Sequence, residues 1–330
     1  MAQDVAEDVA EPLPAGAAAR PPEPAGWAVL RPRLRRWRRY WVWDPLFGAL
    51  YYALHYGCRL LPIDWCSGFG GFLGGLNWRW RYRGLRARVE NLYVRLSAAP
   101  ATEADAQRAS RRLFENLGRV MLEFSILDRL WAAGRIEVVG SEHLLAARAA
   151  GTPVIVMSLH LANWEVIGPS IVGLGFYGAK GFYLPPPSRF DEKLLVRARE
   201  RYGAILFRPG IAGTRMAQRH LVEDRGILLF YGDEERRGHV SAPLFGRPIP
   251  ARSNLVTIVR LAWASGAVVI PAHAERLDGA RFRVTYRPPI DLGPEAPGAL
   301  ADNVHRLNRG ITPIVQAQLH HWYMLTEWRR

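Results

Sequence analysis

Apolar and polar positions divide the chain into parts with different periodicities. Residues 1–30 are rich in alanine and proline, show no regular apolar period, and are predicted to form a disordered tail. Residues 31–90 mix arginines with aromatic side chains and contain a long, weakly apolar stretch at residues 44–78. From Thr102 onward apolar residues recur every three or four positions, which predicts an amphipathic helix that begins with a capping box to Asp105.

Short runs of β-forming residues then alternate with segments of helical spacing. The runs are Val154–Ser158, Ile227–Tyr231 and residues 180–184, 204–207, 267–271 and 281–286. Strands that alternate with helices favour an α/β fold with a mostly parallel central sheet flanked by helices. We therefore predict that residues 91–330 form one domain of this class.

Residues 31–90 have the charge pattern of a membrane-associating helical region. Two groups of arginines flank the stretch 44–78, which contains no uninterrupted run of ~18 apolar residues. The positive-inside rule then predicts that both ends face the cytoplasm, which favours a re-entrant or interfacial helical pair over a single span. A buried helix pair is an alternative, and so is an RNA-binding surface, although no recognisable nucleic-acid module accompanies the arginines.

The net charge of the chain indicates only a broad class of binding partner. The formal net charge is +14, and only two of the 44 basic residues are lysines, at positions 180 and 193. Such a charge favours an anionic membrane, nucleic acid or acidic protein, but a general preference for arginine explains it equally well. The two cysteines, Cys58 and Cys66, cannot form a four-ligand zinc site, and we expect no metal.

The strongest candidate for chemistry follows the run Val154–Ser158. His160 comes directly after this predicted strand, and Glu165 follows five residues later. On one helix a five-residue offset separates two side chains by about 140°, so the pair can meet only if His160 lies in the bend between strand and helix. A histidine there suits a general base, and a carboxylate on its other ring nitrogen would orient it. We therefore predict that His160 is the catalytic base and that Glu165 orients it.

Other interpretations of this region are weaker. The zinc-protease motif HExxH and the nucleophile motif GxSxG are both absent. Gly173, Gly175 and Gly178 form a GxGxxG, but a strand-like segment and three prolines follow it rather than a phosphate-binding helix. A buried histidine with a purely structural role is the remaining alternative.

A second group of polar residues ends the run Ile227–Tyr231. Asp233 and Glu234 follow this predicted strand, and in a parallel sheet both strands open on the same edge. Arg208 and Arg215 lie near the end of another predicted strand and would suit phosphate groups. We predict that the substrate-binding residues are Asn163, Trp164, Arg208, Arg215, Asp233 and Glu234.

Four stretches of the chain resemble the bacterial lipid A late acyltransferases, a branch of the lysophospholipid acyltransferase superfamily. Residues 160–165 match the H-x4-(D/E) signature, and residues 88–92 resemble an R-x-x-N-L segment. Asp233 with residues 243–248 resembles a D…FFG-x-P block, and residues 266–271 resemble a TGAPVVP-like strand. The resemblance covers about residues 80–330.

The resemblance implies an enzyme of the inner membrane with its active site on the cytoplasmic face. It implies transfer of a fatty acyl chain from acyl carrier protein to a hydroxyl of a lipid A precursor, without a cofactor. Glu234 and the C-terminal residues 322–328 depart from the family pattern, so another glycolipid or phospholipid acceptor and an acyl-CoA donor stay open. The alternative of a different class is a non-catalytic protein that binds membranes or nucleic acid.

Overall fold

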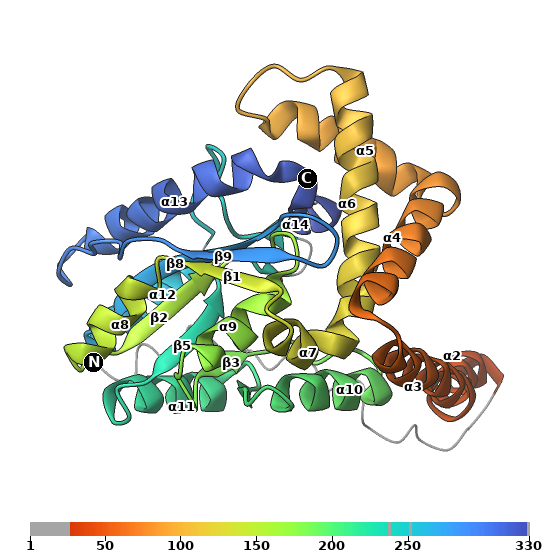
Figure 1. Cartoon of the computed structure of the whole chain (residues 1–330), viewed down its shortest axis with the longest axis horizontal. Helices are drawn as coiled ribbons and strands as arrows, with labels where there is room; N and C mark the ends of the chain where they lie inside the picture. Colours follow the sequence, from red (N-terminus) through yellow and green to blue (C-terminus); the bar gives the residue numbers. More distant parts are fainter. Residues whose placement is uncertain (1–26, 237–238, 251–252, 329–330) are drawn as a thin grey trace.

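The computed structural model describes residues 27–236, 239–250 and 253–328, and seven of its strands form one sheet (Figure 1). The strand order is β1-β9-β8-β2-β5-β3-β4, and all neighbours are parallel except β8 and β9. These strands are β1 (Ile136–Val139), β2 (Val154–Ser158), β3 (Lys180–Phe182), β4 (Ile205–Phe207), β5 (Ile227–Tyr231), β8 (Val268–Arg276) and β9 (Phe282–Tyr286). The predicted α/β class is confirmed.

Helices cover both faces of the sheet because alternate residues of its strands point to opposite sides. On the central strand β2, Ile155 and Met157 join one hydrophobic core, and Val154 and Val156 join the other. The first core is completed by α11 (Ile211–Val222), α12 (Asn254–Ser265) and α13 (Ala299–Ala317). The second is completed by α7 (Leu127–Ala132), α8 (Ser141–Ala149) and α9 (Ile167–Gly173).

Shorter elements surround the carboxyl ends of the parallel strands. Among them, β6 and β7 form a two-stranded antiparallel sheet. The elements are β6 (Glu235–Arg236), β7 (His239–Val240), α10 (Arg189–Glu200), α14 (Met324–Glu327) and the 3-10 helices η2 (Phe124–Ile126), η3 (Trp164–Val166) and η4 (Leu319–His321).

The N-terminal part is helical, as predicted. It comprises α2 (Trp27–Arg38), the π-helical turn η1 (Arg39–Trp43), α3 (Asp44–Leu60), α4 (Ile63–Trp80), α5 (Arg83–Leu96) and α6 (Glu103–Glu123). Residues 1–26 of the predicted tail lie outside the described residues, whereas residues 27–30 belong to α2. The capping box between Thr102 and Asp105 is present at the start of α6.

Glycines allow α4 to lie against α6 with almost no space between the two backbones. A Cβ atom added to Gly74 would lie 2.1 Å from the carbonyl oxygen of Phe114, and one added to Gly118 would lie 2.1 Å from that of Gly70. No side chain larger than hydrogen fits at such separations. These glycines therefore fix the N-terminal helices to the α/β domain through α6.

Large apolar side chains are exposed on α3 and α4. Exposed large side chains on α3 and α4 include Leu46, Phe47, Leu50, Leu60, Trp65, Phe69, Phe72 and Trp80. Trp65 and Trp80 are 71% and 72% exposed, which is unusual for indole rings. Among the residues that the structure describes, no helix has the length and apolar character needed to cross a membrane.

Candidate active site

His160 lies at the carboxyl edge of the sheet, where β2 and β5 end side by side. The register pairs Ser158 at the end of β2 with Tyr231 at the end of β5. His160 and Asp233 each follow two residues later, so equal offsets from paired strand ends bring the two side chains together. The predicted position of His160 between strand and helix is thus observed, and Asp233 shares its edge.

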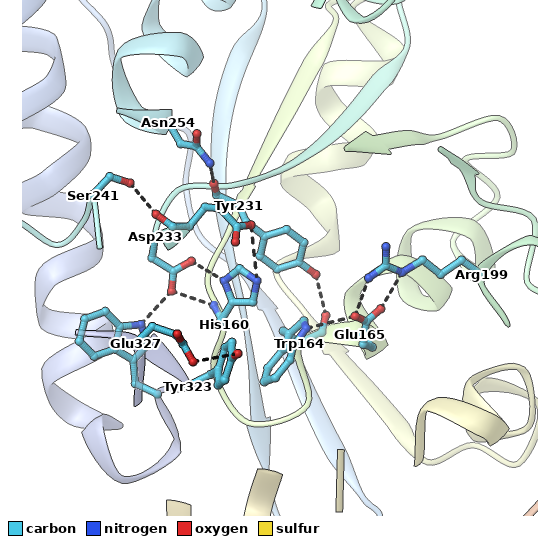
Figure 2. Close-up of polar contacts among 12 residues, drawn as sticks. His160, Trp164, Glu165, Arg199, Tyr231, Asp233, Ser241, Asn254, Tyr323 and Glu327 are labelled. Carbon is cyan, nitrogen blue, oxygen red and sulfur yellow. Dashed lines mark hydrogen bonds and ion pairs between the residues drawn. The ribbon is translucent and has the colours of Figure 1, made fainter. Parts of the chain in front are cut away.

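Asp233 is the hydrogen-bond partner of the His160 imidazole (Figure 2). Its Oδ1 lies 2.8 Å from His160 Nδ1, and its Oδ2 accepts the backbone N–H of His160 at 2.9 Å. The indole N–H of Trp322 also donates to Oδ2, at 2.8 Å. Because Asp233 is fully buried and held from three sides, it fixes the ring and leaves Nε2 for chemistry.

Negative charges around His160 favour its protonated form. Burial lowers the pKa of the imidazole, but the carboxylates of Asp233, Glu234 and Glu165 outweigh that effect and raise it above 6.5. The nearest of these to Nε2 is Glu234, whose Oε2 lies 4.0 Å away. A base with a raised pKa holds the proton that it has taken more firmly.

Aromatic rings enclose the imidazole. The rings of His160 and Tyr231 have centroids 4.3 Å apart, and Trp164 meets His160 edge to face at 5.3 Å. Tyr323 stacks on Trp164 at 5.3 Å. Rings at these distances restrict the rotation of the imidazole and stabilise its cationic form. Trp164 was predicted from sequence as a substrate-binding residue, and it lies against His160.

Glu165 does not make the hydrogen bond to His160 that the sequence predicted. Its carboxylate forms a two-point ion pair with Arg199, with distances of 2.7 Å and 3.1 Å, and accepts the indole N–H of Trp164 at 3.1 Å. The reason is geometric: η3 begins at Trp164 and directs Glu165 toward α10, whereas Asp233 reaches Nδ1 from the neighbouring strand. The orienting carboxylate is therefore Asp233.

Asn163 supports the loop rather than facing a substrate. Its side chain is fully buried, donates to Glu123 Oε2 at 2.8 Å and accepts the backbone N–H of Glu165 at 3.2 Å. Ala162 beside it has a φ of +50°, a conformation that costs energy for a residue with a side chain. The surrounding bonds hold this bend, including one from Asn116 Nδ2 to the carbonyl of Ala162 at 2.9 Å.

A buried ion pair anchors these supporting residues. Glu123 on α6 binds Arg276 on β8 through both carboxylate oxygens, at 2.7 Å and 2.8 Å, and Arg276 Nε also donates to Asn116. The sequence analysis missed Glu123, Arg276, Arg199 and Trp322, because each comes from an element distant in the chain. The sequence analysis placed His160 and Asp233 at the same edge of the sheet but did not pair them.

Arg208 and Arg215 lie away from His160. Arg208 follows β4, the edge strand, where it forms an ion pair with Glu192 and donates to the hydroxyl of Tyr183. Arg215 lies on α11, exposed on the surface. Their contact with a substrate stays a prediction, and neither side chain lies at His160. Glu234, by contrast, lies beside Nε2.

A cavity opens next to Glu165 and Tyr231. It is lined by Glu165, Arg199 and Tyr231 and by the apolar side chains of Ile171, Val172, Phe182, Leu206 and Leu229. Tyr231 lies between this cavity and the imidazole, since it lines the cavity and its ring also contacts that of His160. In the described part of the chain, no group of three or more His, Cys, Asp or Glu side chains is placed to hold a metal ion.

Comparison with known proteins identifies the family. No curated protein sequence is significantly similar to this chain. The family model described as bacterial lipid A biosynthesis acyltransferase matches residues 31–330, which includes every element described above except the start of α2. The chain therefore belongs to the bacterial lipid A biosynthesis acyltransferase family.

Proposed function

We propose that this enzyme transfers a fatty acyl chain from acyl carrier protein to a hydroxyl of a lipid A precursor, at the cytoplasmic face of the inner membrane. Membership of the family supports an acyltransferase. The observation that carries the mechanism is the hydrogen bond between Asp233 and Nδ1 of His160, which leaves Nε2 as the base. The donor, the acceptor and the location rest on the family resemblance and on the surface features below.

The proposed reaction has two steps. Nε2 of His160 takes the proton of the acceptor hydroxyl as its oxygen attacks the thioester carbonyl, and a C–O bond forms. The C–S bond then breaks, and the sulfur of the donor leaves as a thiol with the proton that the imidazolium returns. Asp233 stabilises the imidazolium between the two steps without taking the proton itself. No enzyme nucleophile is needed, because the acceptor attacks directly.

The cavity beside Tyr231, of about 40 Å³, has an apolar lining that suits part of the acyl chain of the donor. Its apolar lining would bury methylene groups, each worth about 0.8 kcal/mol. The ion pair between Glu165 and Arg199 closes the polar side of the cavity near the reacting carbonyl. In this proposal Glu165 lines the cavity and holds Arg199, whereas Asp233 determines the tautomer of His160.

The apolar surface of α3 and α4 supports a membrane location. Exposed tryptophans and phenylalanines settle at the boundary between lipid headgroups and acyl chains, and flanking arginines favour an anionic membrane face. We infer an interfacial attachment that keeps the active site beside its lipid acceptor. The net charge of +14 also suits an acidic carrier protein as donor.

A direct test uses the purified full chain in detergent with acyl carrier protein that carries a labelled acyl chain. The wild-type protein should acylate a lipid A precursor, His160→Ala should reduce the rate by ~10²–10⁴, and the surface variant His305→Ala should behave as wild type. A parallel assay with a lysophospholipid and with acyl-CoA compares the alternative acceptor and donor. Transfer to none of these lipids, or wild-type turnover by His160→Ala, would overturn the proposal.

A further inference from the structure

The C-terminal segment, residues 321–323, pairs with the bend that carries His160. The backbone N–H of Tyr323 donates to the carbonyl of His160 at 2.9 Å. Next to this bond, Leu161 and Trp322 form an antiparallel β-bridge. The two segments lie far apart in the chain, so the end of the chain contributes backbone contacts to a site that is built mainly by the middle of it.

This pairing places the indole of Trp322 on the carboxylate that holds His160. Nε1 of Trp322 donates to Oδ2 of Asp233 at 2.8 Å, while Oδ1 of Asp233 faces Nδ1 of His160 at 2.8 Å. The side chains of Trp322 and Asp233 are both fully buried. A hydrogen bond to a carboxylate is stronger than one between neutral groups, and burial strengthens it further. Trp322 is therefore bonded directly to the partner of the proposed base.

Aromatic neighbours hold this indole in its orientation. The ring centroids of Phe245 and Trp328 lie 6.0 Å and 5.8 Å from that of Trp322. The guanidinium of Arg247 lies over Trp328, 3.8 Å from the ring centroid, and donates to backbone carbonyls of its own loop. A ring packed on two sides has little rotational freedom left to lose. The packing, rather than Asp233, thus determines where the N–H of Trp322 points.

Two further contacts fix the C-terminal segment against the rest of the protein. The side chain of Arg88, on α5, donates to the carbonyl of Thr326. The ring of Tyr323 stacks on that of Trp164, beside His160 (Figure 2). The segment is therefore held at both ends of the stretch that carries Trp322, by α5 and by the loop that follows β2.

Among the described residues, the titratable side chains that face the imidazole come from β5 and the loop after it, η3 and the C-terminal segment. They are Asp233, Glu234, Glu165, Tyr231 and Tyr323. Burial raises the pKa of both tyrosines, so they are uncharged near neutral pH. Glu165 is paired with Arg199, and Glu234 lies 4.0 Å from Nε2. Asp233, which is bonded to Nδ1, is thus the charge through which Trp322 acts on the imidazole.

We propose that Trp322 is a positioning residue for the transfer reaction, and that its indole N–H fixes the Asp233 carboxylate so that Oδ1 stays aligned with Nδ1 of His160. The effect on turnover rests on the proposed function, whereas the effect on the imidazole is a property of the folded protein alone. The hydrogen of the indole N–H carries a partial positive charge and weakens the negative potential that Asp233 exerts on the ring. Removing this N–H should therefore favour the protonated imidazole.

The test is Trp322→Phe in the full chain in detergent, which removes the donor and keeps an aromatic ring. The kcat should fall about tenfold, the factor expected for loss of a charge-assisted hydrogen bond, with less than about a twofold change in KM because Trp322 is fully buried. Combined with Asp233→Asn, the substitution should cause no further loss, since it acts through that carboxylate.

The readout that separates positioning from packing is the titration of His160. In protein labelled with ¹³C-histidine, NMR gives the pKa of this imidazole directly, and His160→Ala assigns its signal. Trp322→Phe should move the titration upward by on the order of half a pH unit. Asp233→Asn should move it downward, so the two variants are expected to shift the same group in opposite directions.

The matched control is Trp263→Phe. The indole of Trp263, on α12, donates to the carbonyl of Gly293 at 2.8 Å, so this variant loses a hydrogen bond of equal length to a neutral acceptor. It should keep the wild-type kcat and the wild-type titration of His160. If circular dichroism shows that Trp322→Phe does not fold, benzothienylalanine at position 322 replaces it, because its sulfur removes the N–H and preserves the shape of the ring.

Three results would overturn the proposal. They are an unchanged or lowered titration of His160 in the Trp322 variant, a loss of kcat that adds fully to that of Asp233→Asn, and equal effects of Trp322→Phe and Trp263→Phe. Because the NMR titration needs no turnover, it decides this inference even if the protein transfers no acyl chain. Failure of the proposed function and failure of the role of Trp322 are thus separate results.

Discussion

His160 and Asp233 each lie two residues beyond the ends of paired strands, and their side chains meet with Nδ1 and Oδ1 2.8 Å apart. The register of β2 and β5 therefore selects the hydrogen-bond partner of His160. Glu165, five residues from His160 in the chain, binds Arg199 instead. The H-x4-E signature thus joins two residues with different partners, the proposed base His160 and a carboxylate in a buried ion pair that borders the cavity.

Replacing Asp233 tests this pairing. Asp233→Asn should keep the fold but lower kcat by ~10²–10⁴, because an amide stabilises neither the imidazolium nor the required tautomer. The matched control is Asp224→Asn, since Asp224 also binds a histidine, His220, at 2.8 Å but lies next to α11. The measurement is single-turnover acyl transfer together with circular dichroism. Equal activity of the two variants would show that Asp233 does not orient the base.

The pH dependence of the reaction should report the raised pKa of His160. Only the neutral imidazole accepts a proton, so kcat/KM should rise with pH through an inflection above 6.5. Asp233→Asn removes a negative charge that favours the protonated ring, so its inflection should move to lower pH. Rates measured from about pH 5.5 to 9 give both values. An inflection that stays in place or moves upward in this variant contradicts the assignment.

The ion pair between Glu165 and Arg199 should contribute to stability as well as to the site. Both side chains are largely buried, so removing one partner leaves an uncompensated charge, at a cost of ~3–5 kcal/mol. Arg199→Met combined with Glu165→Gln should lose less than the sum of the two single variants. Urea unfolding measures each value. The control is Glu137→Gln, which breaks an exposed pair with Arg283 and should cost at most ~1 kcal/mol.

The glycine contact between α4 and α6 gives a sharper structural test. Gly74→Ala should lower the free energy of unfolding by ~1–3 kcal/mol, because the new methyl group would collide with the backbone of α6. Gly68→Ala lies on the same helix with nothing within 4 Å and should be neutral or stabilise by up to ~1 kcal/mol. Thermal unfolding of both proteins checks the order. Equal melting temperatures would mean that the two helices separate readily.

Membrane attachment is best tested with substitutions rather than truncation. Deleting residues 1–78 would remove most of α4 and uncover the α6 face that Gly70 and Gly74 contact. The triple variant Trp65→Ser, Phe72→Ser and Trp80→Ser should instead weaken binding to anionic vesicles at least about tenfold, by loss of buried apolar area.

The control for this experiment changes an equal number of exposed apolar residues elsewhere. Tyr177→Ser, Leu145→Ser and Leu277→Ser lie outside the N-terminal helices and should leave vesicle binding unchanged. Co-sedimentation with vesicles of phosphatidylglycerol and phosphatidylethanolamine measures both triple variants. Similar losses in the two proteins would show that binding depends on general surface character and not on α4.

The sequence by itself determined the class of fold, the position of His160 and the edge at which the polar residues gather. Apolar periodicity records which face of each element is buried, and the residues that follow a strand in a parallel sheet always emerge at one edge. His160 and Asp233 were both placed at that edge on these grounds. The capping box at Thr102 could likewise be predicted from the sequence, since its hydrogen bonds join residues three positions apart.

Only the tertiary structure decided which residues meet. The neighbours β2 and β5 are distant in the chain, so neither segment alone encodes their pairing. Arg199 reaches Glu165 from α10, and Trp322 reaches Asp233 from the C-terminal segment. The local pattern of apolar residues determines which face each element buries. The partner of a buried charge depends instead on how the elements pack together. For this reason the sequence predicted Glu165 as the partner of His160, whereas the structure has Asp233 in that place.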